Sequence, residues 1–220
     1  MLLDPDTSSC PDDRTGVSER GASQGVYAAG KETRRDILEV ASSLFRERGL
    51  AGVTKPDIAK AAGVFPSQLG YYFGTKEALF VEAACRDVLH LAADVERAAA
   101  GTRTPRTYVR ALVRTALSSP SLLFFAEAVL LVRTRPELAA GVRGAFGRLY
   151  DEGERAVAEN LIRRGWHIRA SAAAEARGFW AAVLGVCLEQ AAFGASFSPA
   201  STEATVDLVL NLYESPAPPD

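Results

Sequence analysis

The stretch AGVTKPDIAKAAGVFPSQLGYYFGTKEALF, residues 51–80, decides the fold of the N-terminal part of the chain. It holds two short segments with helical spacing, at residues 54–62 and 66–73, separated by a glycine turn. Thr54 can cap the first segment with its hydroxyl, and Gly63 can end it in the left-handed conformation. The sequence therefore predicts two short helices joined by a tight turn.

Longer helices are predicted on both sides of this pair. Residues 31–48 carry apolar side chains at helical spacing and end at Gly49, and residues 76–99 form a second long helical segment. Two short helices braced by a longer one make a helix-turn-helix, in which the second short helix fits the major groove of DNA. We expect residues 66–73 to be that groove-binding helix.

The segment RRDILEVASSLFRERGLAGVTKPDIAKAAGVFPSQLGYYFGTKEALF, residues 34–80, resembles the DNA-binding domain of TetR-family transcriptional regulators. The resemblance rests on IL…A..LF…G, the threonine that opens the second helix, IA..AGV, L.YYF and TKEAL. It implies that bases are read from Ser67 and Gln68, with Tyr71 packed inside the domain. It also implies contacts to phosphate by Thr54, Lys55, Tyr72 and Lys76; together with Ser67, Gln68 and Tyr71 these form the candidate DNA-binding set.

Two positions depart from the family pattern. Phe65 stands where a capping serine or threonine is common, so the cap is missing unless Ser67 supplies it. Gly70 stands where a tyrosine is common, and glycine costs about 1 kcal/mol in a helix relative to alanine. Phe65 could instead contact a thymine methyl group.

Composition and charge indicate an ordinary globular protein. The chain has 220 residues, 48% hydrophobic, and a net charge of −2, although residues 31–80 carry eight basic and six acidic side chains, net +2. That excess supports a surface facing phosphate only weakly. The three cysteines lack CxxC spacing, and neither a secretory signal nor a membrane-spanning run is visible. We therefore expect a cytoplasmic protein without a metal, a cofactor or a membrane partner.

The predicted fold is all-α, with about nine helices in two units. We expect a disordered tail over residues 1–30, a helix-turn-helix domain over 31–78, a helical bundle over 79–214, and a short tail over 215–220. In the bundle, helices are predicted near residues 105–118, 121–134, 136–164, 172–197 and 201–213.

The family resemblance implies that the bundle binds a small ligand and dimerises through its last two helices. An intramolecular core would use the same apolar residues. The candidate dimer residues are Phe179, Val183, Val186, Val206, Leu210 and Tyr213. Aromatic side chains could line a cavity for a largely apolar ligand or could simply be core, and the candidate ligand residues are Phe124, Glu127, Phe146, Tyr150 and Trp180.

Glu127 is the polar residue of this half that most needs an explanation. It interrupts SLLFFAEAVLLV, residues 121–132, which is apolar nearly all round. A carboxylate in a buried helix needs a partner. It could pair with Arg110 or Arg114, or it could face a ligand.

The resemblance points to a ligand-responsive, homodimeric repressor that binds a near-palindromic site on double-stranded DNA. A helical ligand-binding or interaction module that has lost specific DNA reading is the alternative, supported by Gly70 and the weak positive charge. An enzyme is not expected, because we find no catalytic triad context, HExxH, GxGxxG or phosphate loop, and the two histidines, His90 and His167, lie far apart.

Overall fold

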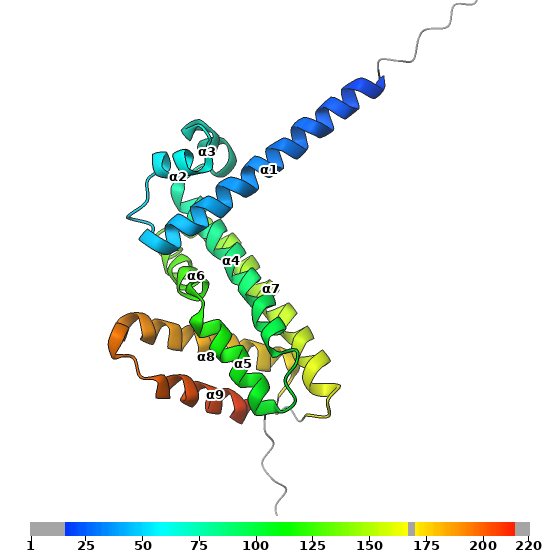
Figure 1. Ribbon diagram of the computed structural model, residues 1–220, viewed down its shortest axis with the longest axis vertical. Coiled ribbons are helices and arrows are strands. Elements are labelled where there is room, and N and C mark those ends of the chain that lie inside the picture. The colour runs from blue at the N-terminus through cyan, green and yellow to red at the C-terminus, as the bar shows by residue number, and fades with distance from the viewer. Residues whose placement is uncertain (1–15, 167–169, 214–220) are drawn as a thin grey trace, which may run out of the picture.

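The computed structural model describes residues 16–166 and 170–213 (Figure 1). Within that part of the chain all regular structure is helical, which confirms the predicted all-α fold with nine α-helices. The helices are α1 (Gly16–Arg48), α2 (Lys55–Ala62), α3 (Pro66–Phe73), α4 (Lys76–Ala99), α5 (Pro105–Ser118), α6 (Pro120–Leu131), α7 (Ala139–Val157), α8 (Ala172–Phe193) and α9 (Pro199–Tyr213).

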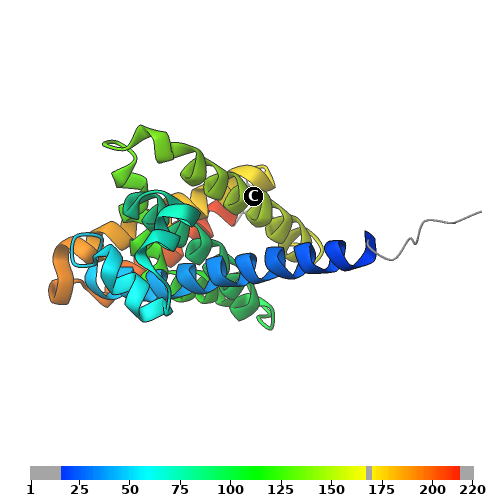
Figure 2. The same cartoon turned by 90° about the horizontal axis from the view of Figure 1, so that it is seen from above.

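Helix α1 is longer than predicted. It spans 33 residues from Gly16, so the prediction of a tail over residues 1–30 is wrong for residues 16–30, while residues 1–15 lie outside the described part. Adding residues to an existing helix requires no new nucleus, so a segment with poor propensity can continue a stable one. Figures 1 and 2 show the first half of α1 projecting away from the rest of the molecule.

Helices α1, α2 and α3 pack with the start of α4 as one unit. Its core is made of large apolar side chains with at most 2% of their surface exposed: Ile37, Phe45, Ile58, Leu69 and Leu79. The predicted helix bounds 66–73 and the start at residue 76 are confirmed, and the second helix begins at Lys55 with Thr54 as its cap. This unit is the predicted helix-turn-helix.

Helix α4 joins this unit to the rest of the molecule through an aromatic cluster. Phe45 of α1, Phe80 of α4 and Phe124 of α6 meet with ring centroids 5.1 Å apart for Phe45–Phe80, 4.9 Å for Phe80–Phe124 and 6.3 Å for Phe45–Phe124. Two of these contacts are edge-to-face, the geometry that aromatic rings favour. A displacement of α6 or α4 would therefore move aromatic rings that contact α1 directly.

The bundle comprises α4 to α9, with α7 packed against both α4 and α8, and α5 against α9 (Figure 1). Ion pairs fasten α5 to α9, because Glu203 accepts hydrogen bonds from Arg110 at 2.9 Å and Arg114 at 2.8 Å. These pairs hold the C-terminal helix in place.

The predicted bounds of the bundle helices are partly right. Residues 105–118 are confirmed, whereas the single helix predicted over residues 136–164 is a 3-10 turn (Pro136–Leu138), α7, and a π-helical turn (Ala158–Ile162). Helix α8 stops at Phe193 instead of residue 197, because Gly194 adopts a positive φ of 53°. The predicted domain boundary at residue 78 falls inside α4, and residues 215–220 lie outside the described part.

Candidate nucleic-acid interface and bundle cavity

The start of α2 is fixed by a reciprocal cap. Asp57 donates its backbone N–H to the Thr54 hydroxyl at 3.3 Å, and the Asp57 carboxylate accepts from the Thr54 backbone N–H at 2.9 Å. Hydrogen bonds from the Thr54 side chain and backbone lower the pKa of the Asp57 carboxyl group. The Thr54 hydroxyl also donates to Asp57 at 2.6 Å, so a contact to phosphate would have to share this hydroxyl with the cap.

The start of α3 is capped by Gln68 rather than by Ser67. The Gln68 side-chain oxygen accepts a hydrogen bond from the Phe65 backbone N–H at 2.9 Å. This bond compensates for part of the missing cap hydroxyl, and it leaves the side-chain amide N–H groups of Gln68 for other partners. A bidentate contact with adenine would require Gln68 to release the cap.

The outer face of α3 is occupied by two exposed aromatic residues. Phe65 is 76% exposed and Tyr71 is 83% exposed, and Ser67 and Gly70 lie exposed between them. The prediction that Tyr71 packs inside the domain is therefore wrong. Tyr72 is the half-buried member of the pair, and its hydroxyl oxygen lies 3.5 Å from where a Cβ at Gly30 of α1 would stand.

The two lysines of the candidate set are directed into the domain. Lys55 donates to the backbone carbonyl of Gly74 at 3.0 Å, and Lys76 donates to the carbonyls of Leu50 and Val53, both at 2.8 Å. Two of the three ammonium hydrogens of Lys76 are thus used to hold the loop between α1 and α2. The arrangement gives Lys76 a structural role in place of the predicted grip on phosphate.

Arg34 of α1 braces the back of α3. Its guanidinium donates to Glu82 of α4 at 2.7 Å and lies over the ring of Phe73, 4.8 Å from the centroid. Arg34 thus connects three helices, α1, α3 and α4, so α3 presents its outer face on a fixed support.

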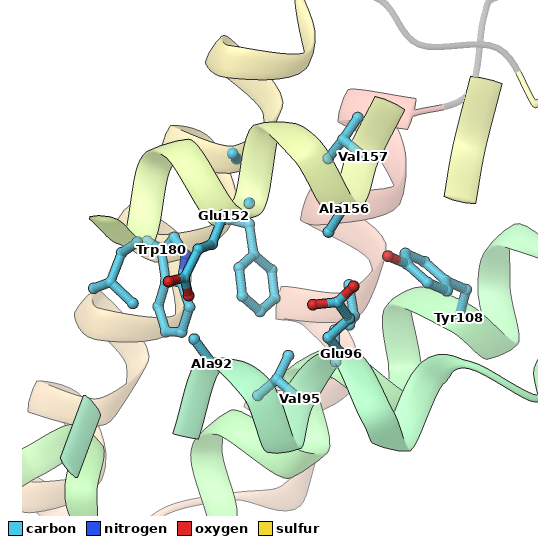
Figure 3. A pocket seen from close by; sticks show the side chains of 13 residues that line it. Ala92, Val95, Glu96, Tyr108, Glu152, Ala156, Val157 and Trp180 are labelled. Carbon is cyan, nitrogen blue, oxygen red and sulfur yellow. The ribbon is translucent and has the colours of Figure 1, made fainter. Parts of the chain in front are cut away.

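The bundle contains a cavity of about 50 Å³ between α4, α5, α7 and α8 (Figure 3). Its walls are mostly apolar, with four polar side chains among them: Glu96, Tyr108, Glu152 and Trp180. The remaining lining residues are Ala92, Val95, Leu112, Leu149, Gly153, Ala156, Val157, Ala176 and Phe179. A Cβ at Gly153 would stand 2.9 Å from the Cβ of Ala176, so this glycine allows α7 and α8 to approach closely beside the cavity.

Trp180 is the one candidate ligand residue that lines this cavity. Phe124 belongs to the junction with α1, whereas Phe146 stacks between Phe125 and Tyr150 at centroid distances of 5.1 and 5.7 Å. Helical spacing alone does not separate aromatic residues of the core from those of a cavity. Phe124, Phe146 and Tyr150 do not line this cavity.

Glu127 lies on the exposed face of α6, and neither predicted arginine partner pairs with it. Arg110 and Arg114 bind Glu203 instead. Desolvation by its apolar neighbours raises the pKa of the Glu127 carboxyl group. Glu127 is not among the residues that line the bundle cavity, so the structure gives it neither predicted role.

Three candidate dimer residues belong to the core of the single chain. Phe179, Val183 and Val206 are 6%, 0% and 0% exposed, so a partner subunit could not bury them further. Val186 is half-buried, and the side chains of Leu210 and Tyr213 lie outside the described part. The exposed apolar side chains of α8 and α9 are different ones: Leu188, Phe193 and Leu208.

Metal and membrane chemistry find no support in the described residues. Among residues 16–166 and 170–213, no group of three His, Cys, Asp or Glu side chains could hold a metal ion. In the same ranges no single helix is long and apolar enough to cross a bilayer, and α5 with α6 passes that test only as a pair bent by 66°.

Two family models match the chain. Residues 37–83 match the model described as bacterial regulatory proteins of the tetR family, and residues 105–210 match one described as the C-terminal region of bacterial transcriptional repressors. Together they cover the helix-turn-helix and α5 to most of α9, while residues 84–104, which include most of α4, lie between the two matches.

Curated relatives match over shorter segments. The HTH-type transcriptional repressor KstR2 of Rhodococcus jostii is 44% identical over 55 residues, 24% of this chain and 27% of the relative. The HTH-type transcriptional regulator BetI of Rhizobium meliloti is 37% identical over 82 residues, 37% of this chain and 40% of the relative. The chain thus spans less than half the length of the curated relatives it matches.

A solved structure matches over nearly its full length. The crystal structure of a transcriptional regulator from Rhodococcus sp. RHA1 is 37% identical and has a TM-score of 0.73, covering 82% of this chain and 95% of its own. A TetR-family regulator from Mesorhizobium loti, 18% identical, shares the fold with a TM-score of 0.65 over 84% of this chain and 98% of its own. The chain belongs to the TetR family of transcriptional regulators.

Proposed function

We propose that the protein is a homodimeric repressor that binds a near-palindromic DNA site through α3 and is released from it by a small molecule. Membership of a family of transcriptional regulators argues against the enzyme alternative. The observation that carries the proposal is the outer face of α3, where Phe65 and Tyr71 are exposed on a helix supported by Arg34. Residues 31–78 would bind DNA, and residues 79–214 would bind the ligand and the partner subunit.

The DNA contacts would come from the exposed end of α3. Phe65 and Tyr71 can contact thymine methyl groups or the sugar-phosphate backbone, and the side-chain amide N–H groups of Gln68 can donate to a base edge. Gly70 supports a close approach, because no atom lies within 4 Å of where its Cβ would stand. In this assignment Phe65 and Gly70, the two departures from the family pattern, would both serve DNA binding.

Dimerisation would use the exposed stripe of α8 and α9. Ala181, Gly185, Leu188 and Ala192 follow one another at helical spacing along α8 and are exposed, and Leu208 adds an apolar side chain on α9. Small residues let two helices approach closely, and Leu188 and Leu208 would supply apolar area. Two-fold symmetry would then present two copies of α3 to successive turns of the major groove.

Ligand release would act through α4, which lines the bundle cavity and also belongs to the helix-turn-helix. The cavity of about 50 Å³ is far below the ~300–1,000 Å³ of typical ligand pockets, so a ligand must widen the bundle to enter. Widening would displace Ala92, Val95 and Glu96 of α4, and the aromatic cluster would pass that displacement to α1. We also propose that the protein is cytoplasmic. DNA binding requires that compartment in bacteria, and the free thiols of Cys85 and Cys187 are compatible with its reducing conditions.

Selection of genomic DNA fragments by the purified full-length chain at near-physiological salt tests this proposal. We expect a near-palindromic site, and we expect Tyr71→Ala and Phe65→Ser to weaken its binding about tenfold each. Phe65→Ser also restores a cap hydroxyl, so the stability of the variant should not fall while its affinity does. Leu130→Ala removes an exposed apolar side chain from α6 and serves as the control. Binding that is sensitive to salt but enriches no sequence would instead favour a module that has lost DNA reading.

A further inference from the structure

The cavity of the bundle carries negative charge on two opposite walls. Glu96 belongs to α4 and Glu152 to α7, and both carboxylates lie at the space between the helices (Figure 3). The side chains of Glu96 and Glu152 are both 37% exposed, so each carboxylate borders the cavity while it keeps access to solvent. Whether a cationic ligand can bind here therefore depends on how strongly Glu96 and Glu152 are already paired within the protein.

The arginines that pair with these two carboxylates do not line the cavity. Arg155 approaches Glu96 at 3.6 Å and Arg148 approaches Glu152 at 3.4 Å, and the two arginine side chains are 53% and 64% exposed. Single contacts at such distances on exposed side chains are weak. Each carboxylate thus keeps lone pairs for a cation inside the cavity.

Two buried polar groups also face the cavity. Tyr108 and Trp180 are each 3% exposed, and among the described residues neither the Tyr108 hydroxyl nor the Trp180 indole N–H has a hydrogen-bond partner. Burial above all, and then Glu96, raises the pKa of the Tyr108 phenol to about 12, with Arg164 acting in the opposite direction. Both groups therefore remain donors that line the cavity and are available to an acceptor on a ligand.

The cavity also offers aromatic faces. Phe179 and Trp180 pack edge-to-face with centroids 5.2 Å apart, and both line the cavity. Arg164, the cation that acts on Tyr108, is occupied elsewhere, since it donates to the backbone carbonyls of Thr102 at 2.6 Å and Ala100 at 3.1 Å. Carboxylates together with aromatic faces attract a positive charge and repel an anion.

We propose that the effector is a compact organic cation whose ammonium or amidinium group lies between Glu96 and Glu152. Its apolar body would contact Phe179 and Trp180, and an oxygen on the ligand could accept from Tyr108. This inference rests on the proposed ligand-responsive function and names the chemical class of its ligand. A compact molecule is favoured because the cavity must widen for any ligand larger than its present volume.

Three probes of equal chain length test the class: pentylammonium, pentan-1-ol and pentanoate, each titrated calorimetrically into the full chain at neutral pH. We expect pentylammonium to bind at least about tenfold more tightly than the alcohol, since a charge-assisted bond contributes more than a neutral one. Pentanoate should not bind. Glu96→Gln and Glu152→Gln should each remove most of the preference for the cation, whereas Glu154→Gln, on the exposed face of α7, should not.

Equal binding of the cation and the alcohol, no binding of the cation, or an unchanged preference in both glutamine variants would overturn the inference. Thermal unfolding of each variant shows whether a loss of binding reflects a loss of folding. Release of selected DNA is measured with the same probes. A cation that binds without releasing DNA contradicts the proposed function but not the ligand class, and release by the alcohol alone contradicts the class but not the function.

Discussion

The guanidinium of Arg46 donates a 2.9 Å hydrogen bond to the carboxylate of Asp87, whose side chain is only 4% exposed. The Ser42 hydroxyl donates to the same carboxylate oxygen, and Arg86 donates to the other oxygen at 3.2 Å. Ser42 and Arg46 lie on α1, and Arg86 and Asp87 lie on α4. A buried polar network thus joins the DNA-binding unit to the helix that lines the bundle cavity.

Asp87→Ala should lower the free energy of unfolding by about 3 kcal/mol, because it leaves two arginines and a serine without their common acceptor. Urea denaturation followed by circular dichroism measures the change. Asp94→Ala is the matched control, since Asp94 lies on the same helix with a 56% exposed side chain and pairs with Arg97 on the surface. Equal losses in the two variants would show that the buried network adds nothing to stability.

Two glycines of the helix-turn-helix should respond in opposite ways to alanine. Gly70→Ala should stabilise the protein by about 1 kcal/mol, since α3 gains helix propensity and the new methyl group meets no atom within 4 Å. Gly63→Ala should destabilise it by about 1 kcal/mol, because the φ of Gly63 is 66° and alanine is strained there. Thermal unfolding of both variants tests this, and a stabilising Gly63→Ala would contradict the assigned C-terminal cap of α2.

Leu188→Asp should convert the dimer to a monomer, because a charge would be buried at the centre of the proposed α8 face. Sedimentation velocity at several protein concentrations measures the state of assembly. Tyr71→Ser, which alters an exposed side chain at the DNA-binding end, should leave the dimer intact. A dimer that persists in Leu188→Asp would show that the interface lies on another surface.

The buried thiols should resist alkylation in the folded protein. Burial raises the pKa of both Cys85 and Cys187 to about 11, with smaller contributions from Glu82 and Glu127 respectively. At pH 8 the reactive thiolate of each should therefore be about a hundredfold rarer than at a thiol with pKa 9. Iodoacetamide labelling read by peptide mass spectrometry, with and without guanidinium, checks this. Labelling of either thiol at the rate seen in guanidinium would contradict the burial.

The helix-turn-helix could be predicted from sequence because its signals are local. A threonine cap, a left-handed glycine and apolar residues four apart each act within one turn of a helix, and the bounds 66–73 followed from them. The same local reasoning failed for residues 16–30, where a helix with few stabilising signals of its own continues from a stable neighbour. It also failed to place Tyr71 and Tyr72, since adjacent residues differ only in which face of the helix is covered.

The bundle cavity could not be predicted for a different reason. Its polar residues come from four helices, and no spacing in the sequence indicates that Glu96, Tyr108, Glu152 and Trp180 meet. Arg110, Arg114 and Glu203 show the same limit, because their pairing depends on how α9 packs against α5. Phe179, Val183 and Val206 were predicted at a dimer interface but belong to the core, since α8 is apolar on most of its faces.

The inward direction of Lys55 and Lys76 has a consequence for how the protein responds to ionic strength. Each phosphate that a cation neutralises releases counterions, and the logarithm of the association constant falls by about 0.9 per phosphate for each tenfold rise in salt. Lys55 and Lys76 are bonded to backbone carbonyls, so a phosphate would have to compete with those bonds for their ammonium groups. Their contribution to the salt dependence of DNA binding should therefore be smaller than that of lysines with free ammonium groups. The steepness of that dependence would then be set mainly by arginine.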